Sequence, residues 1–150
     1  LGCIELLDRS GVDLNGADVV VLGRSNIVGL PVSMMLLHRN ATVTMCHSRT
    51  KDLQSKVAAA DVIIAAIGIP EFVKGEWVKP GATVIDVGVN FKDAPERKSG
   101  KKMCGDVDFA AAAEHCGATS APVGNHSFTS GCTAVSAHAR TPGRSELAGA

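Results

Sequence analysis

A glycine-containing turn between two apolar segments carries residues suited to binding a phosphate. Residues 19–22 form a short, mostly β-branched run that favours a buried strand over residues 18–22, and Gly23 ends it. Gly29 then opens a segment with helical apolar spacing. A strand, a glycine turn and a helix N-terminus direct backbone N–H groups and the positive end of the helix dipole at an anion. Arg24 and Ser25 add a guanidinium and a hydroxyl to the same turn.

The spacing of the two glycines is not that of a general nucleotide-binding motif. Gly23 and Gly29 read G-x-x-x-x-x-G, which differs from the G-x-G-x-x-G fingerprint of dinucleotide-binding folds. The turn also lacks the Lys-Ser or Lys-Thr pair of a P-loop. Spacing alone therefore leaves an ordinary strand-to-helix turn as an open alternative.

The segments around this turn predict an α/β fold. Further apolar runs favour strands at residues 42–46, 62–67 and 83–87, and helical spacing is expected over residues 4–9, 32–37, 51–60 and 109–114. Strands separated by helices or crossovers predict a Rossmann-like parallel sheet with helices on both faces, in a single domain. Gly23, Gly68 and Gly88 each follow a predicted strand, at the sheet edge where such folds bind ligands.

The residues after the second predicted strand favour NADP over NAD. An acidic residue at this point would bind the ribose 2′-hydroxyl of NAD, but residues 46–50 read Cys-His-Ser-Arg-Thr and contain no carboxylate. Ser48 and Arg49 instead offer a hydroxyl and a guanidinium, the partners that a 2′-phosphate needs. The alternative is that Thr50 caps the next helix and Arg49 is merely solvated.

Composition narrows the class of protein. Lys and Arg number 15, as do Asp and Glu, and 45% of the residues are hydrophobic, so we expect a soluble globular protein without a nucleic-acid partner. No apolar run approaches the roughly 20 residues of a membrane span. The five cysteines are widely spaced without a C-x-x-C pair, which argues against disulfides and zinc and favours a reducing compartment: cytoplasm, mitochondrial matrix or plastid. A lesser alternative is a metal site built from Cys46, His47, Cys104, His115, Cys116, His126 and Cys132.

Two segments differ from the rest of the chain. Residues 91–102 are polar and charged, and we expect a solvated surface loop there. From Ser120 onward Ser, Thr, Ala, Gly, Pro and His dominate. The expected domains are therefore an NADP-binding domain over residues 1–119 and a divergent, poorly ordered tail over residues 120–150.

Four strings, in order along the chain, resemble one enzyme family. They are G-R-S-N-I-V-G-L-P, N-A-T-V-T-M-C-H-S-R-T, P-E-F-V-K-G-E-W-V-K-P-G-A-T-V-I-D-V-G-V-N and G-D-V-D-F. They look like the C-terminal, NADP-binding half of the bifunctional methylenetetrahydrofolate dehydrogenase/methenyltetrahydrofolate cyclohydrolase family. The resemblance covers residues 1–118 and implies oxidation of 5,10-methylenetetrahydrofolate by NADP, hydrolysis of 5,10-methenyltetrahydrofolate to 10-formyltetrahydrofolate, and a homodimer in the full-length family.

The resemblance also implies roles for individual residues. By position, Gly23, Arg24 and Ser25 match the family's pyrophosphate and ribose-phosphate turn, closed by Gly29. Ser48, together with Arg24, matches the contact to the 2′-phosphate, and Arg49 lies beside it. Gly68 and Val89 match backbone-lined contacts on the nicotinamide side.

Two departures from the family pattern limit what the chain is expected to do. The family's folate-binding and catalytic residues lie on an N-terminal domain with a Tyr-x-x-x-Lys helix, and this chain contains no tyrosine. After Thr119 the family's P-V-P-G-G-V-G-P-M-T loop is replaced by A-P-V-G-N-H-S-F-T. We therefore expect a domain incomplete at both ends, without catalytic or metal-binding residues and inactive alone. The alternative function is a non-catalytic NADP-binding or dimerisation module.

Overall fold

The computed structural model describes residues 2–93, 95, 100–115, 118–120 and 135–136. Its helices are α1 (Gly2–Arg9), α2 (Gly29–Leu37), α3 (Leu53–Ala59), α4 (Phe109–His115) and the 3-10 helix η1 (Gly75–Trp77). Its strands are β1 (Asp18–Leu22), β2 (Thr42–Cys46), β3 (Val62–Ala65), β4 (Thr83–Asp86), β5 (Asn90–Asp93), β6 (Lys101–Cys104), β7 (Ala118–Ser120) and β8 (Val135–Ser136). None of the helices in this part of the chain is long and apolar enough to cross a membrane.

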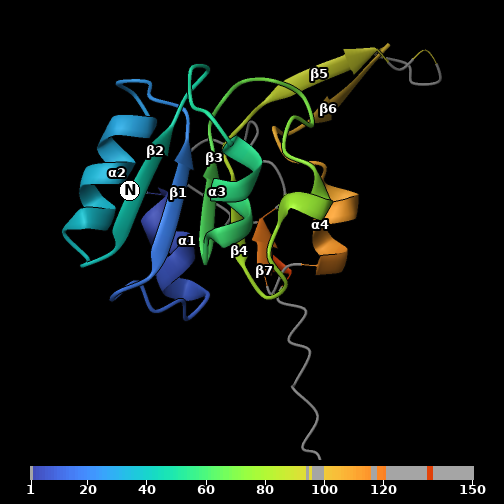
Figure 1. Cartoon of the computed structure of the whole chain (residues 1–150). Coiled ribbons are helices and arrows are strands. Elements are labelled where there is room, and N and C mark those ends of the chain that lie inside the picture. Colours follow the sequence, from blue (N-terminus) through green and yellow to red (C-terminus); the bar gives the residue numbers. More distant parts are fainter. Residues whose placement is uncertain (1, 94, 96–99, 116–117, 121–134, 137–150) are drawn as a thin grey trace, which may run out of the picture.

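The main sheet has the strand order β2-β1-β3-β4-β7-β8. The pairs from β2 through β7 are parallel, and β8 is antiparallel to β7. Helices α1 and α2 cover one face, whereas α3, η1 and α4 cover the other (Figure 1). The predicted Rossmann-like class is confirmed. The chain changes direction across the sheet between β1 and β3, and open α/β sheets bind ligands at such a switch point, outside the carboxyl ends of the strands (here called the carboxyl edge).

Alternate residues of β1 enter two separate cores. Val19 and Val21 pack with the apolar side chains of α1 and α2, whereas Val20 and Leu22 pack with those of α3 and α4. All four side chains are buried. A parallel strand covered on both faces therefore reads as a continuous apolar run, which is why its bounds were predicted correctly from sequence.

Several predicted element ends differ from the structure: β4 ends at Asp86 rather than at residue 87, and α1, α2 and α3 begin at residues 2, 29 and 53 rather than at 4, 32 and 51. For the end of β3 and the predicted cap of α3, a hydrogen bond is the cause. The sheet ladder of β3 ends at Ala65 rather than at Ile67, because the Ile67 N–H donates to Asp106 Oδ2 at 2.6 Å. Thr50 does not cap α3: its Oγ1 accepts the His47 N–H at 2.8 Å and closes the turn that precedes the helix. The residue before α3 is Asp52, with φ 53° and no side-chain cap.

Within residues 91–102, predicted as a solvated loop, residues 91–93 and 101–102 belong to the antiparallel strands β5 and β6 (the β5–β6 hairpin), so for these residues the prediction is wrong in secondary structure. Phe91 lies opposite Met103, and both are exposed. The hairpin projects beyond the carboxyl edge (Figure 1, upper right). Lys92 forms an ion pair with Glu71, which ties β5 to the body of the domain. The predicted tail over residues 120–150 lies outside the described residues, apart from Ser120 and β8.

A carboxylate at the opposite edge of the sheet makes acid stability testable. Asp61 Oδ2 accepts the Asp18 N–H at 3.0 Å, and its other oxygen forms an ion pair with Lys79. The Lys79 hydrogen bond, and then that of Asp18, hold the pKa of Asp61 below its ordinary value. A lowered pKa contributes stability that is present above the unfolded-state pKa and is lost as pH falls through the folded-state pKa.

We therefore expect Lys79→Met to raise the pKa of Asp61 toward its ordinary value and to flatten the loss of stability in acid. An NMR titration of the Asp61 carboxyl, with urea unfolding over the same pH series, measures both effects. The change in stability should be small because the pair is exposed. An Asp61 pKa that is unchanged in the variant would contradict the assignment.

Candidate functional site

The turn after β1 is shaped by two close backbone contacts that only glycine permits. Gly23 has φ +116°, and a Cβ there would lie 2.2 Å from the carbonyl oxygen of Ala66, just beyond β3. A Cβ on Gly29 would lie 2.3 Å from the carbonyl oxygen of Gly23. The first turn of α2 is thus packed directly against the turn that precedes it, and that turn against the end of β3.

Ser25 accepts backbone N–H groups at the start of α2 and leaves those of residues 24–27 available. Its Oγ accepts the N–H groups of Val28 at 3.1 Å and Gly29 at 3.4 Å, and its carbonyl oxygen accepts that of Leu30 at 3.0 Å. Within the described residues, the N–H groups of residues 24–27 donate to no acceptor. The Ser25 hydroxyl hydrogen also remains free to donate. These donors and the positive end of the α2 dipole together form a site for an anion.

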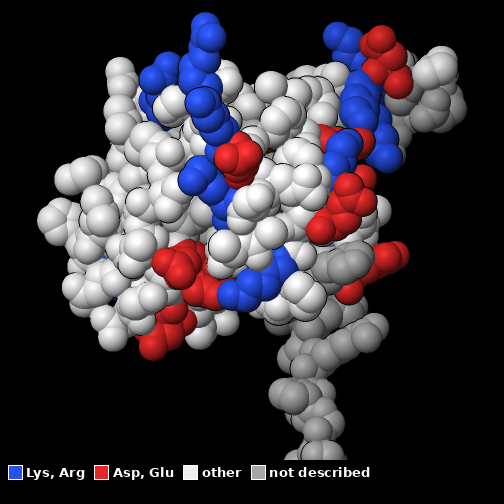
Figure 2. Space-filling model, viewed as in Figure 1, with Lys and Arg blue, Asp and Glu red and all other residues white. Residues whose placement is uncertain are grey.

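The loop after β2 lies next to this turn at the carboxyl edge. Leu22 pairs with Cys46, and the Gly23 N–H donates to the Cys46 carbonyl at 2.9 Å, so the two loops leave neighbouring strands at the same level. Ser48 and Arg49 are exposed. Figure 2 shows Lys and Arg side chains over this loop, at the top of the view, and over the β5–β6 hairpin.

Two basic residues in these loops, Arg24 and His47, have side chains that are available to bind a ligand. Arg24 is exposed and forms no ion pair with any described residue. His47 Nδ1 accepts the Arg49 N–H at 3.1 Å, so the neutral imidazole carries its proton on Nε2 and presents a donor. No hydrogen bond joins the side chain of Arg24 to Ser48 or Arg49, so their shared role at a phosphate stays a prediction.

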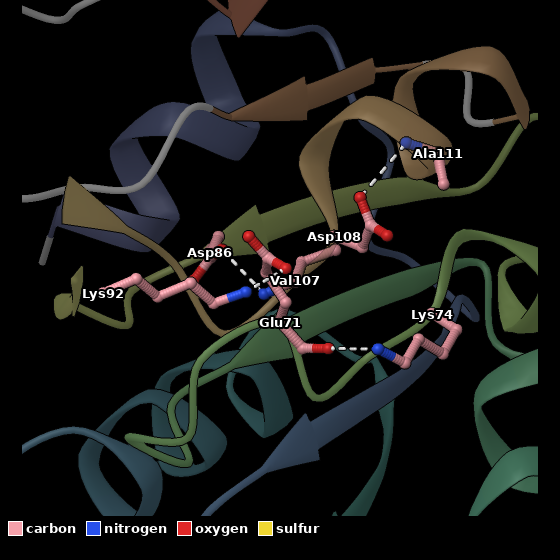
Figure 3. A network of polar contacts seen from close by, with 7 residues as sticks. All are labelled: Glu71, Lys74, Asp86, Lys92, Val107, Asp108 and Ala111. Carbon is pink, nitrogen blue, oxygen red and sulfur yellow. Dashed lines mark hydrogen bonds and ion pairs between the residues drawn. The ribbon is translucent and has the colours of Figure 1, made fainter. Parts of the chain in front are cut away.

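A buried carboxylate at the end of β4, which the sequence analysis did not single out, organises the other half of the carboxyl edge. Asp86 is 1% exposed and accepts three backbone N–H groups, from Gly88 at 2.9 Å, Asp106 at 3.0 Å and Val107 at 2.9 Å. Figure 3 shows its bond to Val107. Burial raises the pKa of Asp86 above its ordinary value, although the three N–H bonds act in the opposite direction. A Cβ on Gly105 would lie 1.9 Å from Asp86 Oδ2, so glycine makes room for this carboxylate.

A second buried carboxylate continues the network to β3. Asp106 is 0% exposed, and its Oδ2 accepts the N–H groups of Ile67 at 2.6 Å and Gly68 at 2.9 Å. Its Oδ1 accepts Nδ2 of Asn90 at 2.7 Å. The signal for both carboxylates was present in the sequence: each is an acidic residue next to buried apolar residues and close to a glycine.

The last two predicted site residues lie on either side of this network. Gly68 follows β3 with φ +78°, and a Cβ there would have no neighbour within 4 Å. Val89 follows β4 and is 39% exposed. All eight predicted cofactor residues therefore lie in the loops at the carboxyl edge or in the first turn of α2. Their contact with a cofactor stays a prediction.

A metal site has no support in the described part of the chain, where no three His, Cys, Asp or Glu side chains could hold an ion together. Cys116, His126 and Cys132, which the metal alternative included, lie outside the described residues.

Comparisons with known proteins agree with this geometry. The family model described as tetrahydrofolate dehydrogenase/cyclohydrolase, NAD(P)-binding domain, matches residues 1–130. The bifunctional protein FolD 2 of Geobacter sulfurreducens is 60% identical over 117 residues, which are 78% of this chain and 39% of the relative. FolD 2 of Arabidopsis thaliana is 56% identical over 116 residues, or 77% of this chain and 39% of the relative. The chain thus spans about two fifths of the length of these relatives.

Solved structures of the same class superpose on the fold. The methylenetetrahydrofolate dehydrogenase-cyclohydrolase of Trypanosoma brucei, complexed with NADP and an inhibitor, has a TM-score of 0.75 and 44% identity, covering 81% of this chain and 41% of that one. The bifunctional enzyme FolD of Campylobacter jejuni has a TM-score of 0.72 and 41% identity, covering 82% of this chain and 41% of that one.

Proposed function

This chain belongs to the tetrahydrofolate dehydrogenase/cyclohydrolase family, and we propose that it forms the part of such an enzyme that binds NADP. The observation that carries the proposal is the turn after β1. Its amides at residues 24–27 are without an acceptor among the described residues, and they precede the positive end of α2. This arrangement fits the pyrophosphate of a dinucleotide.

The residues of the carboxyl edge fit the rest of the cofactor. Gly23, Arg24 and Ser25 would hold the pyrophosphate, with Gly29 allowing the close approach. Ser48 and Arg49, together with Arg24, would hold the 2′-phosphate; residues 46–50 contain no carboxylate to repel it. Gly68 and Val89 would border the nicotinamide half. When bound, the dinucleotide supplies the acceptor for a hydride.

The reaction proposed for the whole protein is that of the family. NADP would oxidise 5,10-methylenetetrahydrofolate, and the methenyl product would be hydrolysed to 10-formyltetrahydrofolate. We propose that the folate is bound by the part of the relatives that this chain does not span. The 150 residues would then supply the cofactor half and no catalytic residue, and would be inactive alone, because hydride transfer needs both reactants held together.

We also propose a cytoplasmic location and a homodimer. The Drosophila melanogaster relative, 52% identical over 116 residues, is named cytoplasmic C-1-tetrahydrofolate synthase. The sequence argument leaves a mitochondrial or plastid location as the alternative. For the homodimer, support comes from the apolar side chains that α2 and the preceding turn expose: Ile27, Leu30, Met34 and Leu37. A helix that is apolar on its outer face favours a partner surface.

A fluorescence titration of the purified chain with NADPH and NADH tests the cofactor proposal. We expect NADPH to bind more tightly than NADH, because only NADPH carries the 2′-phosphate. We expect Arg24→Ala to weaken NADPH about tenfold or more, the effect of one lost hydrogen bond to a charged group. The matched control is Arg9→Ala, since Arg9 lies on α1, where its Nε forms an ion pair with Glu5 one helical turn away.

The possible outcomes separate the hypotheses. Equal affinity for the two nucleotides would overturn the 2′-phosphate assignment, and no binding of either would overturn the cofactor role. In one outcome the chain binds NADPH, and folate is turned over once the remaining segment of the Geobacter sulfurreducens relative is added. This would support the proposal that the chain is the cofactor-binding half of an enzyme. NADPH binding without turnover in that mixture would support the alternative, a non-catalytic NADP-binding or dimerisation module.

A further inference from the structure

The buried Asp106 carboxylate accepts hydrogen bonds from three donors among the described residues, and none of these donors is a cation. Its partners are the N–H groups of Ile67 and Gly68 and Nδ2 of Asn90. All three partners are hydrogen-bond donors, which matches the acceptor oxygens of a carboxylate, and a buried polar group is tolerated where its hydrogen bonds are made.

We propose that Asp106 is a positioning residue for the dinucleotide: it locks the turn after β3 to Asn90 after β4 and so presets the wall of the nicotinamide half-site. This inference rests on the proposed NADP-binding function. It adds a residue that does not itself contact the cofactor but determines where Gly68 and its neighbours stand.

Hydrogen bonds on two sides hold the backbone of Asp106, and this restricts where its carboxylate can lie. On one side the Asp106 N–H donates to Asp86 at 3.0 Å. On the other, the Val73 N–H donates to the Asp106 carbonyl at 3.0 Å, and the Asp108 N–H donates to the Val73 carbonyl at 2.9 Å. Asp106 thus joins segments 39 and 16 residues away, Ile67 and Asn90 respectively, into one rigid unit.

This network also makes the two halves of the carboxyl edge differ in charge and in the N–H groups that they have available. Asp106 occupies the N–H groups of Ile67 and Gly68, so these two amides of the turn after β3 are not available to a phosphate. The two buried acidic groups, Asp86 and Asp106, lie at the β3–β4 half of the edge, whereas the free amides and Arg24 lie at the β1–β2 half. The pyrophosphate is therefore directed to the turn after β1, and the nicotinamide, which carries no phosphate, to the side of Asp106.

Gly88 provides a second way to disturb the same carboxylate. A Cβ on Gly88 would lie 2.1 Å from Asp106 Cγ, and Gly88 is not among the glycines with positive φ. An alanine there leaves the backbone conformation accessible and every charge in place. Its effect would be to displace the Asp106 carboxylate. Asn90→Ala is a milder variant, since it removes one donor from a half-exposed position.

The test compares a whole cofactor with its adenosine half. NADPH and 2′-phosphoadenosine 5′-phosphate are titrated against wild type, Asp106→Asn, Gly88→Ala and Asn90→Ala. The matched control is Asp108→Asn, because Asp108 lies two residues away and bonds the Ala111 N–H at the start of α4 (Figure 3). Amide hydrogen exchange of Ile67 and Gly68 is measured without ligand.

We expect Asp106→Asn and Gly88→Ala to weaken NADPH about tenfold while the adenosine fragment changes less than about twofold, since one charged hydrogen bond is worth a factor of this size. The Ile67 and Gly68 amides should exchange faster in both variants. Asn90→Ala should give a smaller loss in the same direction and serves where the other two do not fold.

Equal weakening of both ligands, or unchanged NADPH affinity in every variant, would overturn the positioning role and leave Asp106 as a structural residue. Wild type that binds neither ligand would instead overturn the proposed function, and the role toward the dinucleotide with it. The two failures are thus distinguishable in one data set.

Discussion

Gly23→Ala is expected to lower the free energy of unfolding by about 3 to 5 kcal/mol, from backbone strain and overpacking together. The φ of +116° is one that side chains rarely adopt, and the new Cβ would lie 2.2 Å from the Ala66 carbonyl oxygen. That carbonyl cannot easily withdraw, because the Ala66 N–H donates to Leu22 at 2.8 Å and holds β3 against β1. Urea unfolding monitored by circular dichroism measures the loss.

Gly16→Ala is the matched control for this prediction. Gly16 also has a positive φ, +78°, but a Cβ there would have no neighbour within 4 Å. It should cost only the strain of the left-handed conformation, about 1 to 2 kcal/mol. Gly16→Ala should also retain NADPH binding, which Gly23→Ala should lose. Equal losses of stability in the two variants would show that the contact with Ala66 is not what requires glycine.

The parts of the fold that depend on neighbours along the chain could be predicted from the sequence. The strands β1 and β2 were predicted at their observed bounds, because their apolar runs and the glycine or polar residues that end them are local signals. Thr50 was misassigned because its hydroxyl could form either of two local hydrogen bonds. It was expected to cap α3, but in the structure it accepts the His47 N–H. The β5–β6 hairpin was missed because charged residues hide the pairing of Phe91 with Met103.

The candidate site, like the fold, has one part that could be predicted from the sequence and one part that could not. The turn after β1 is a continuous string, so its place between a strand and a helix could be predicted as a unit, and its binding of an anion stays a prediction. The Asp86–Asp106 network could not be predicted, since the partners of these carboxylates, Gly88 apart, lie 16 to 39 residues away and meet only when β3 and β4 pair. The residue types gave a hint in the form of Asp86, which directly follows the apolar residues Val84 and Ile85. What that carboxylate binds is a property of the tertiary fold.

Asp86→Asn is expected to cost about 2 to 4 kcal/mol of unfolding free energy, because it leaves buried donors without acceptors. The asparagine oxygen can replace Oδ1, which accepts Gly88 and Asp106. Its amide nitrogen must then face the Val107 N–H, where Oδ2 accepts a bond of 2.9 Å in the wild type. Two donors would meet at a position that is 1% exposed, where water cannot easily enter.

The control for this prediction is Glu114→Gln, which makes the same change of carboxylate to amide on the exposed side of α4 and should alter stability by less than about 0.5 kcal/mol. Because Asp86 also holds the Asp106 N–H, Asp86→Asn should release the turn after β3 and weaken NADPH in folded protein as well. If Asp86→Asn unfolds at the same urea concentration as wild type, the Gly88 to Val107 segments must be held by their own backbone pairing. The two carboxylates would then contribute little to the stability of the fold, and the positioning role of Asp106 would lose the support that it draws from β4.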